Sequence, residues 1–396
     1  MMAGPTAARS PMHIAFVTSL VPDARPMSGF AIANRAVVDG LRSLGHRVSI
    51  VGAALPDAPE PDDPDTHVLA RLAVENVDAS ALRKLGWLGG AVRHGLPFAA
   101  AKLLALDAAP RTVEALDPDL LVLNSYQMAA AFPALRERPH IYFSHNVEHE
   151  TARENARVAS GIERHLYARD ARILERLERD LVAHASHVWT LTEEDRAGLG
   201  VSGNASVLPL VVPRRETAPH AAIDFDTVMI GTWTWTANRL GLLWYLDEVV
   251  PHLPADTRVA VAGSVPGGLP EAHRHVTFLG RVDDAEAFLD RGHVVPLVAR
   301  GGTGVQLKTI EAFQNGRETV ATRSSLRGVG CPPPNCAVAD EPEAFAAALA
   351  EAVRRGRAGE GRTADGEAFR HAQLERLRAG LTAGLERALP RETVAA

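Results

Sequence analysis

The order strand, glycine turn, helix, strand opens both halves of this chain and limits its fold more than any other feature. In the first half, the apolar residues 13–18 predict a strand, and a loop with Ser28 and Gly29 follows it. A helix is expected at 31–45, because apolar residues recur there near helical spacing, and 48–52 then predicts a second strand. Such βαβ units build parallel sheets whose ligands bind at the carboxyl ends of the strands.

The second half restarts the pattern with a strand that ends in the glycine turn at Gly231. Further elements are expected as strands at 120–124, 141–144, 187–192, 259–263 and 276–280, and as helices at 161–184 and 238–250. We therefore predict an α/β chain of two Rossmann-like βαβ domains, at 12–207 and 216–365, which face each other across a cleft. The Pro- and Arg-rich piece 208–215 is the expected linker. A charged helix at 366–390 is expected to pack back toward the first domain.

A glycine turn and helix at 301–313 carry the strongest functional signal. The turn, Gly301-Gly302-Thr303-Gly304-Val305, follows an apolar run and opens a helix with Lys308 and Glu311. The free amides and positive dipole end of a helix N-terminus suit an anion, and Lys308 adds a point charge. Glu311 can accept hydrogen bonds from a pair of neighbouring hydroxyls. A phosphate next to a diol describes a nucleotide sugar.

Composition excludes several classes of function. With 46% hydrophobic and 23% charged residues, the chain has the make-up of a globular protein. Its net charge of −6 gives no support to nucleic-acid binding, which usually shows as a basic excess. No apolar run approaches the roughly 20 residues that span a bilayer, and the N-terminus lacks a clear cleavage site. We expect a cytoplasmic protein with no transmembrane segment.

Taken together, these elements resemble the GT-B glycosyltransferases of family 4, over residues 12 to 390. The most specific piece is GTGVQLKTIEAFQNGRETVATRSSLRGV, which begins at Gly302. The next is FSHNVEHE at 143–150, and the glycine loop near Gly29 is a weaker match. The resemblance implies a GT-B fold and sugar transfer with retention of the anomeric configuration. We expect the reaction to need no metal ion and no other cofactor.

In that family the sugar donor lies mainly on the second domain. The resemblance implies that Glu311 binds the ribose hydroxyls and that Arg281 lies near the base. The backbone of the glycine turn holds the diphosphate and the sugar, which maps to Gly302, Thr303, Gly304 and Val305. We also assign Gly231 and Arg239 to the donor site.

On the first domain, Gly29 resembles the loop glycine that approaches the diphosphate, and His145 resembles the histidine that faces the transferred sugar. The predicted catalytic residues are His145, Lys308 and Glu311. A front-face reaction is the natural hypothesis, because no enzymic nucleophile is obvious. The departing phosphate oxygen would help to remove the proton of the acceptor.

Three positions depart from the family pattern. Thr303 stands where the family usually has its first glutamate, which leaves the identity of the donor open. The usual Arg and Lys after the first strand of the second domain are missing, so Lys308, with Arg239 or Arg300, must meet the charge of the diphosphate. Glu318 stands where the family usually has proline, and the sequence offers no physical account of that change.

The stretch 145–149 also spells H-x-x-E-H, a zinc-protease motif in reverse. That chemistry needs both histidines on one helical face, together with a third ligand. His145 directly follows a predicted strand, so the pair need not converge, and a sugar-facing or a structural histidine are the other interpretations. The charged residues of the helix at 161–184 are expected on a solvated face, namely Glu175, Arg176, Glu178, Arg179 and Asp180.

The sequence thus predicts a glycosyltransferase that moves a sugar from a nucleoside-diphosphate sugar to a hydroxyl acceptor. That acceptor can be a small molecule, a glycan or a lipid-linked glycan. A nucleotide-sugar epimerase, a zinc hydrolase and a catalytically silent sugar-nucleotide-binding subunit remain as alternatives. The stretch 82–88 leaves peripheral attachment to a membrane open, and a plain amphipathic helix explains it as well.

Overall fold

A computed structural model of the chain describes residues 11–22, 28–73, 80–213 and 222–388. Part of the predicted linker and the predicted limits at 216 and 390 lie outside these residues. The chain divides into two compact units. Unit 1 comprises the described residues of Met1–Thr190, Asp195–Leu208 and Leu377–Ala396, and unit 2 those of Leu191–Glu194 and Pro209–Arg376.

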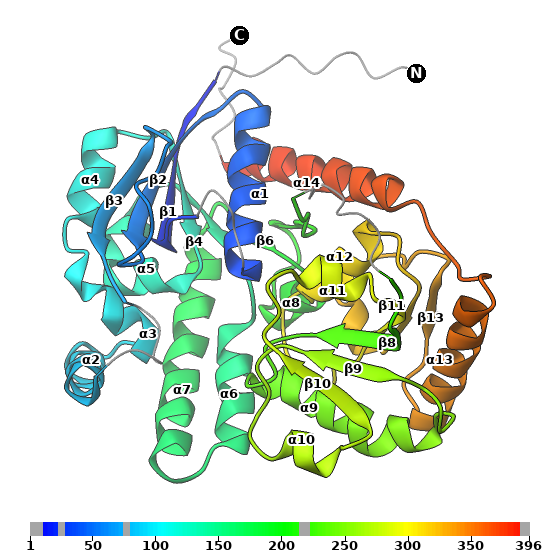
Figure 1. Ribbon diagram of the computed structural model, residues 1–396. Helices are drawn as coiled ribbons and strands as arrows, with labels where there is room; N and C mark the ends of the chain where they lie inside the picture. The colour runs from blue at the N-terminus through cyan, green and yellow to red at the C-terminus, as the bar shows by residue number, and fades with distance from the viewer. Residues whose placement is uncertain (1–10, 23–27, 74–79, 214–221, 389–396) are drawn as a thin grey trace, which may run out of the picture. The chain divides into compact units, whose positions relative to one another are not determined.

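Unit 1 is built on a parallel sheet whose described strands have the order β3-β2-β1-β4-β5-β6-β7 (Figure 1). The strands are β1 (His13–Leu20), β2 (Arg47–Ala54), β3 (Thr66–Arg71), β4 (Leu120–Asn124), β5 (His140–Phe143), β6 (His187–Thr190) and β7 (Ala205–Val207). The helices are α1 (Gly29–Ser43), α2 (Ala81–His94), α3 (Phe98–Ala101), η1 (Lys102–Ala105), α4 (Ala109–Leu116), α5 (Tyr126–Ala131), η2 (Pro133–Glu137), α6 (Glu148–Val158), α7 (Gly161–His184) and α8 (Glu193–Gly198), the last of which begins in unit 2.

A capping serine and a glycine with positive φ set the two ends of helix α1. Ser28 is the N-cap, and its side chain accepts a hydrogen bond from the Ala31 N–H at 3.2 Å. Gly45, just beyond the helix, has a φ of 89°, which a residue without a Cβ adopts without strain. The glycine that the sequence places in the loop, Gly29, is the first residue of the helix.

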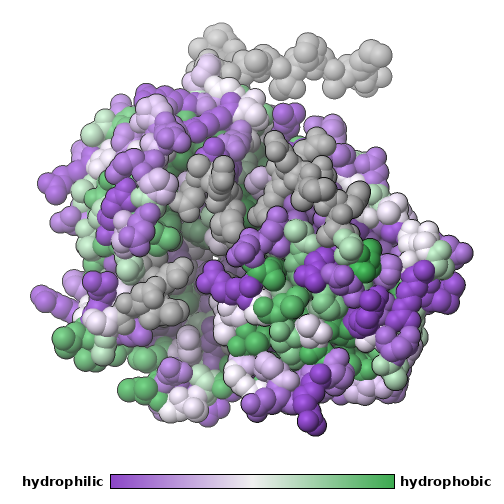
Figure 2. Space-filling model, in the orientation of Figure 1, coloured by the Kyte–Doolittle hydropathy of each residue, from purple (hydrophilic) through white to green (hydrophobic). Residues whose placement is uncertain are grey.

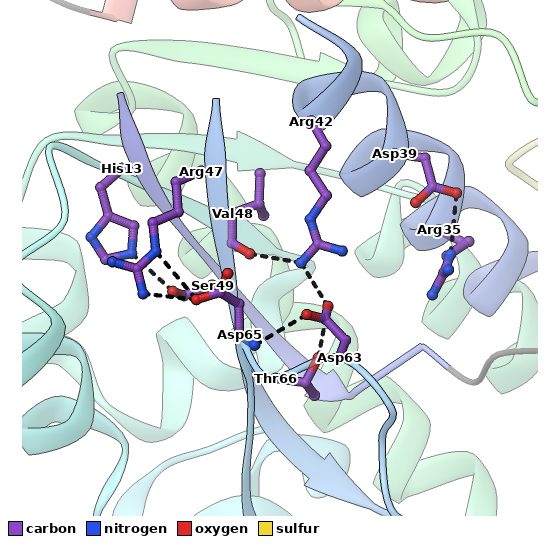
Figure 3. Close-up of polar contacts among 10 residues, drawn as sticks. All are labelled: His13, Arg35, Asp39, Arg42, Arg47, Val48, Ser49, Asp63, Asp65 and Thr66. Atoms are coloured by element: carbon purple, nitrogen blue, oxygen red, sulfur yellow. Dashed lines mark hydrogen bonds and ion pairs between the residues drawn. The ribbon is translucent and has the colours of Figure 1, made fainter. Parts of the chain in front are cut away.

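The two edge strands, β3 and the short β7, are the parts of this sheet that the hydrophobic pattern does not predict, and β3 is the longer of them. All residues of β3 are half-buried, so it lacks the apolar run of a central strand. Polar contacts help to hold it instead (Figure 3). Arg42 donates to the Val48 carbonyl at 2.8 Å and to Asp63 at 2.6 Å, and Arg47 pairs with Asp65 at 2.8 Å. These contacts tie α1 and β2 to the loop that leads into β3.

Unit 2 is built on a second parallel sheet, with the described strands in the order β10-β9-β8-β11-β12-β13. The strands are β8 (Phe225–Ile230), β9 (Val259–Ala262), β10 (Val276–Gly280), β11 (Gly292–Leu297), β12 (Thr319–Ala321) and β13 (Cys336–Val338). The helices are α9 (Thr236–Trp244), η3 (Tyr245–Val249), η4 (Val250–His252), α10 (Leu269–Ala272), α11 (Ala285–Leu289), α12 (Leu307–Gln314), η5 (Arg323–Leu326), α13 (Pro342–Arg357) and α14 (Gly366–Ala388).

Both faces of this sheet are buried, as expected for a parallel sheet. Successive side chains of a strand point to opposite faces, and neighbours along β8 accordingly enter different cores. Met229 packs in a cluster with Tyr245 and Phe345, which come from η3 and α13. Val228 packs in another cluster with Phe288 and Phe313, from α11 and α12. The predicted pair of Rossmann-like parallel α/β domains is confirmed.

The last helix, α14, has contacts in both units. Near its start, Phe369 meets Phe313 edge-on with ring centroids 5.5 Å apart in unit 2. From Leu377 onward it belongs to unit 1, where Leu381 is fully buried. A Cβ at Gly384 would lie 2.3 Å from the Trp189 indole nitrogen, so the helix runs directly against β6. None of the described helices is both long and apolar enough to cross a membrane.

Candidate active site

The glycine turn of unit 2 has the backbone shape that its sequence predicts. Gly301, Gly302 and Gly304 have φ values of 104°, 86° and 73°, all in the region that side chains disfavour. The turn follows β11 and leads into α12, whose N-cap residue Gln306 makes no side-chain hydrogen bond to the first turn. The carboxyl end of a parallel strand therefore delivers the chain to a helix N-terminus, which suits an anion.

A guanidinium holds this turn by its carbonyl groups. Arg327 donates to the Gly301 oxygen at 2.9 Å, to the Gly304 oxygen at 3.2 Å and, by a further contact, to the Gly302 oxygen. Because these carbonyl oxygens are hydrogen-bonded, the peptide groups of the turn, and with them their N–H groups, are held in one orientation. Sequence reasoning missed Arg327, because nothing in its neighbourhood shows which loop it reaches.

Lys308 lies in the first turn of α12, and its ammonium sits 4.9 Å from the centre of the Trp233 ring. Burial lowers the pKa of Lys308 to about 8. Among the described residues, this ammonium has no carboxylate partner and no hydrogen bond. It borders a small cavity lined by Met229, Ile230, Trp233, Leu289, Val295, Pro296 and Leu297. A buried cation without a carboxylate favours an anionic ligand.

Gly231 and the two tryptophans after it occupy different surroundings. Gly231 directly follows β8, and a Cβ on the neighbouring Gly263 would lie 1.9 Å from the Gly231 carbonyl oxygen. Trp233 is fully buried and donates its indole N–H to the Ala262 oxygen at 2.7 Å. Trp235 is 72% exposed. Trp233 therefore packs against Lys308, and it is Gly263 that must lack a side chain where the two strand ends meet, while a Cβ on Gly231 would lie 3.2 Å from the Trp233 ring.

The remaining predicted donor residues are spread around the same strand ends. Glu311 is half-buried in α12, one helical turn beyond Lys308. Arg281 follows β10 directly and is exposed, as is Arg239 in α9. Arg300 is already engaged, since its guanidinium lies 4.7 Å from the Trp244 ring and donates to the Asp340 oxygen at 3.0 Å. Of the two cations nearest to the turn in the sequence, Arg300 is thus engaged, and Lys308 has no carboxylate partner among the described residues.

In unit 1, a hydrogen-bond relay defines the state of His145. Its Nε2 lies 2.7 Å from the Asn124 side-chain oxygen, the Asn124 amide donates to Thr18 at 2.8 Å, and Thr18 donates to the Leu20 carbonyl at 2.9 Å. The Leu20 carbonyl can only accept, so the Thr18 hydroxyl donates to it and accepts from the Asn124 amide nitrogen. The Asn124 side-chain oxygen then faces His145 as an acceptor, and His145 must therefore carry its proton on Nε2. Its Nδ1 is therefore an acceptor.

The His145 ring is buried between two aromatic rings. Phe143 and Phe30 lie 4.4 and 4.7 Å from it, centroid to centroid. Burial lowers the pKa of His145 to about 3, so the imidazole is neutral at physiological pH. Phe30 belongs to the first turn of α1, next to Gly29, so unit 1 brings both of its predicted site residues together.

The prediction that Glu178 lies on a solvated face is wrong. This carboxylate is 1% exposed, and it accepts the N–H groups of Glu148 and His149 at 2.8 and 3.0 Å. It also contacts Nδ1 of His149 at 2.7 Å. Glu178 caps the N-terminus of α6 from another helix. The signal was available, because Glu178 falls in the same helical stripe as the buried Leu174 and Leu181.

The H-x-x-E-H stretch does not form one helical face. His145 precedes α6, as the sequence led us to expect, and His149 lies inside it. The two rings have separate partners, Asn124 and Glu178. Over the described ranges, no three His, Cys, Asp or Glu side chains converge as a metal site would require. Burial, followed by the charge of Glu178, raises the pKa of Glu148 to about 7.

The structure also explains Glu318, which stands where a proline was expected. Its side chain is 6% exposed, pairs with Arg355 of α13 and accepts the Arg362 N–H at 2.7 Å. Its carbonyl accepts the Val295 N–H at 3.0 Å. Glu318 is therefore a structural ion pair that ties the start of β12 to α13, with no contact to the glycine turn.

Two family models match the chain. One, described as a glycosyl transferase 4-like domain, covers residues 28–215, and another, described as glycosyl transferases group 1, covers residues 224–355. A comparison with curated proteins gives no match.

Solved structures of similar fold extend over nearly the whole chain. Sucrose-phosphate synthase from Thermosynechococcus elongatus is 18% identical, with a TM-score of 0.63 and coverage of 95% of this chain and 97% of that one. TarM is 12% identical, with a TM-score of 0.65 and coverage of 97% of this chain and 100% of that one. A mutant of TarM from S. aureus is also among the similar structures. Anabaena HepE in complex with UDP is 14% identical, with a TM-score of 0.56 and coverage of 95% and 98%.

The two parallel-sheet units and the glycine turn before α12 define the class of the protein, a glycosyltransferase of the GT-B type. The two family models match one unit each and together cover most of the chain. The chain belongs to the family 4-like GT-B glycosyltransferases.

Proposed function

We propose that this glycosyltransferase transfers a sugar from a nucleoside-diphosphate sugar to a hydroxyl acceptor, with retention of the anomeric configuration. The observation that carries the proposal is Lys308. Its ammonium lies against the Trp233 ring in the first turn of α12, the helix that the glycine turn opens, and no carboxylate neutralises it within the described part of the chain. A diphosphate on the turn would supply the missing charge.

The glycine turn and the helix behind it supply the rest of the anion site. Three residues with positive φ let the backbone approach the phosphates closely, and the positive end of α12 favours their charge. Arg327 keeps the turn in place through three carbonyl groups. Glu311 binds the ribose hydroxyls in this proposal, as the family resemblance implies.

The chemical step follows from where charge develops. As the bond from the sugar to the phosphate breaks, negative charge grows on the leaving diphosphate. Preorganised donors aimed at developing charge are usually the largest catalytic contribution, and Lys308 with the turn amides is such a set. The departing phosphate oxygen takes the proton of the attacking hydroxyl on the same face, so the new bond retains the configuration of the old one. The positive charge of the site comes from the protein, so we expect no metal requirement.

His145 positions the sugar and does not act as a general base. Its pKa of about 3 keeps the imidazole neutral, and its Nε2–H is committed to Asn124. The Nδ1 atom remains as an acceptor, which suits a hydroxyl of the transferred sugar.

The ligands in structures of similar fold are of the chemical class that we propose for the donor, nucleoside diphosphates and their sugars. HepE structures contain UDP, UDP with glucose, and UDP-glucose, and starch synthase IV from Arabidopsis thaliana contains ADP and acarbose. These proteins share 12 to 14% identity with the chain, so they support the class of donor and leave its base open.

The test is thermal unfolding of the purified protein with UDP, GDP, dTDP and ADP, each with and without EDTA. A ligand at 100 times its dissociation constant adds about 2.7 kcal/mol to the free energy of unfolding, which a raised midpoint shows easily. We expect one diphosphate to stabilise strongly and EDTA to change nothing. A failure of all four nucleotides would contradict the donor site, and a loss of the response in EDTA would contradict metal independence.

The same preparation separates transfer from its alternatives. A transferase releases diphosphate when an acceptor is added, whereas an epimerase converts the donor sugar without an acceptor. A silent subunit binds the nucleotide and releases no diphosphate with any acceptor.

A further inference from the structure

Helix α2 of unit 1 turns an apolar face to the outside. Leu82, Leu85 and Val92 are 81%, 62% and 63% exposed. Together with Gly89 they are spaced by three or four residues, which places them on one side of the helix. We call these four residues the α2 face. In Figure 2, hydrophobic surface marks the lower left, where Figure 1 places α2.

The opposite side of α2 is firmly attached to unit 1. Ala91 is fully buried, and Arg169 of α7 donates to the Ala91 and Leu96 carbonyls at 2.8 and 2.9 Å. Trp87 packs edge-on against Phe98 with centroids 6.1 Å apart. The α2 face is therefore held outward by contacts on the other side of the helix. A monomeric protein rarely leaves such a face without a role.

The charged residues of α2 and of the segment that follows it are all basic. No acidic residue lies between Ser80 and Leu106, although the chain as a whole carries a net charge of −6. The cations of this stretch are Arg83, Lys84, Arg93 and Lys102. Arg83, Lys84 and Arg93 are exposed beside the α2 face. An apolar helix face on a helix that carries cations and no acidic residue is complementary to a lipid bilayer, whose interior is apolar and whose surface can be negative.

We propose that the α2 face docks on an anionic lipid bilayer, with Leu82, Leu85 and Val92 among the acyl chains and the flanking cations at the headgroups. An amphipathic helix that lies in the plane of the interface binds through its buried apolar area and its attraction to anionic lipid. The helix is a single 14-residue element with no acidic side chain to oppose that attraction. The proposal does not depend on the identity of the donor or the acceptor.

The test is co-sedimentation of the full-length protein with vesicles of phosphatidylcholine, with and without phosphatidylglycerol. The variants are Leu82→Asp with Leu85→Asp, and Ile223→Asp as a matched control, since Ile223 is an exposed apolar residue of unit 2. We expect binding only to vesicles that contain phosphatidylglycerol, weaker at high salt, with the partition coefficient of the double variant at least tenfold lower. The control variant should bind as the wild type does.

A second variant keeps the test decisive if the aspartates disturb folding, which circular dichroism and the unfolding midpoint would show. Arg83→Gln with Lys84→Gln leaves the apolar residues in place and should weaken binding about fivefold per residue removed. The proposal is overturned if the wild type does not bind anionic vesicles, or if both double variants bind them as strongly as the wild type does. A wild-type dimer that Leu82→Asp with Leu85→Asp converts to monomers would show that a second copy covers the face instead.

Discussion

The loop after β5 in unit 1 and the glycine turn after β11 in unit 2 both follow the carboxyl end of a parallel strand, yet they handle charge in opposite ways. The unit 1 loop satisfies its polar groups internally. The Asn124 side-chain oxygen accepts a hydrogen bond from the His145 Nε2–H, and the Glu178 carboxylate accepts hydrogen bonds from the N–H groups at the start of α6. The unit 2 turn is held from its carbonyl side by Arg327, while Lys308 has a ring below it and no carboxylate among the described residues.

The difference indicates that the two loops have different tasks. A buried group whose partners belong to the protein contributes to a fixed shape, because losing one partner leaves the other unsatisfied. A buried cation without such a partner is costly in the free protein and gains when an anion arrives. In the proposed function, unit 1 therefore contributes a fixed loop with the Nδ1 of His145 as an acceptor, and unit 2 contributes a cation that gains when an anion binds.

The largest effect should come from Lys308→Met, which removes the charge and keeps much of the volume. We expect sugar transfer to fall about 100- to 1,000-fold, as when one preorganised donor to developing charge is lost. Arg300→Met is the matched control, because it removes a neighbouring cation that is already engaged by Trp244 and Asp340. Initial rates of diphosphate release measure both variants. Equal losses in the two would show that Lys308 has no special role.

Removing the cap of α6 tests the unit 1 side of the comparison. Glu178→Gln should lower the free energy of unfolding by about 2 to 4 kcal/mol, because a buried charge that accepts two backbone N–H groups and contacts His149 is lost. Glu175, on the same helix, is a more exposed carboxylate that pairs with Arg153, and Glu175→Gln should change the free energy of unfolding far less. Urea unfolding compares them. Similar small changes in both would mean that the cap adds no stability.

Arg327→Lys sharpens the contrast by loosening the turn while keeping the charge. A lysine ammonium cannot reproduce a planar fork that reaches three carbonyl groups, so we expect nucleotide affinity to fall about tenfold with little change in the unfolding midpoint. Arg323→Lys, at an exposed arginine of η5, is the control. Calorimetric titration with the preferred diphosphate measures both. Unchanged affinity in Arg327→Lys would remove this residue from the site.

The smallest expected effect is a pH dependence of nucleotide affinity. The pKa of Lys308 in the free protein is about 8, so the ammonium loses its proton as the pH rises through that value. The diphosphate favours the charged form, and affinity should therefore fall between pH 7 and pH 9, by up to about tenfold. In Lys308→Met the fall should disappear. An identical pH profile in wild type and variant would assign the dependence to another group.

Much of the fold could be predicted because it rests on local patterns. The strand at 120–124 and the helix at 161–184 have the predicted bounds, since a wholly buried strand and an amphipathic helix with a clear apolar stripe show directly in the sequence. The edge strand β3 could not be predicted, because its residues are all half-buried and the loop that leads into it is held by ion pairs to Arg42 and Arg47, which local patterns do not show. The glycine turn at 301–304 was predicted for the same local reason as the long helix, as positive φ favours glycine whatever the surroundings.

By itself, the sequence determined the two βαβ units, the glycine turn and the presence of Lys308 at a helix start, because these follow from short-range spacing. Only the tertiary structure decided which charges are buried and which partners they have. The helical spacing of Glu178 places it on the buried stripe of α7, but its partners at the start of α6 appear only in the fold. Arg327 likewise has no visible role until its guanidinium meets the three carbonyls. The physical reason is that the electrostatic state of a side chain depends on desolvation and on neighbours brought together by the fold, and neither is encoded in the residues next to it.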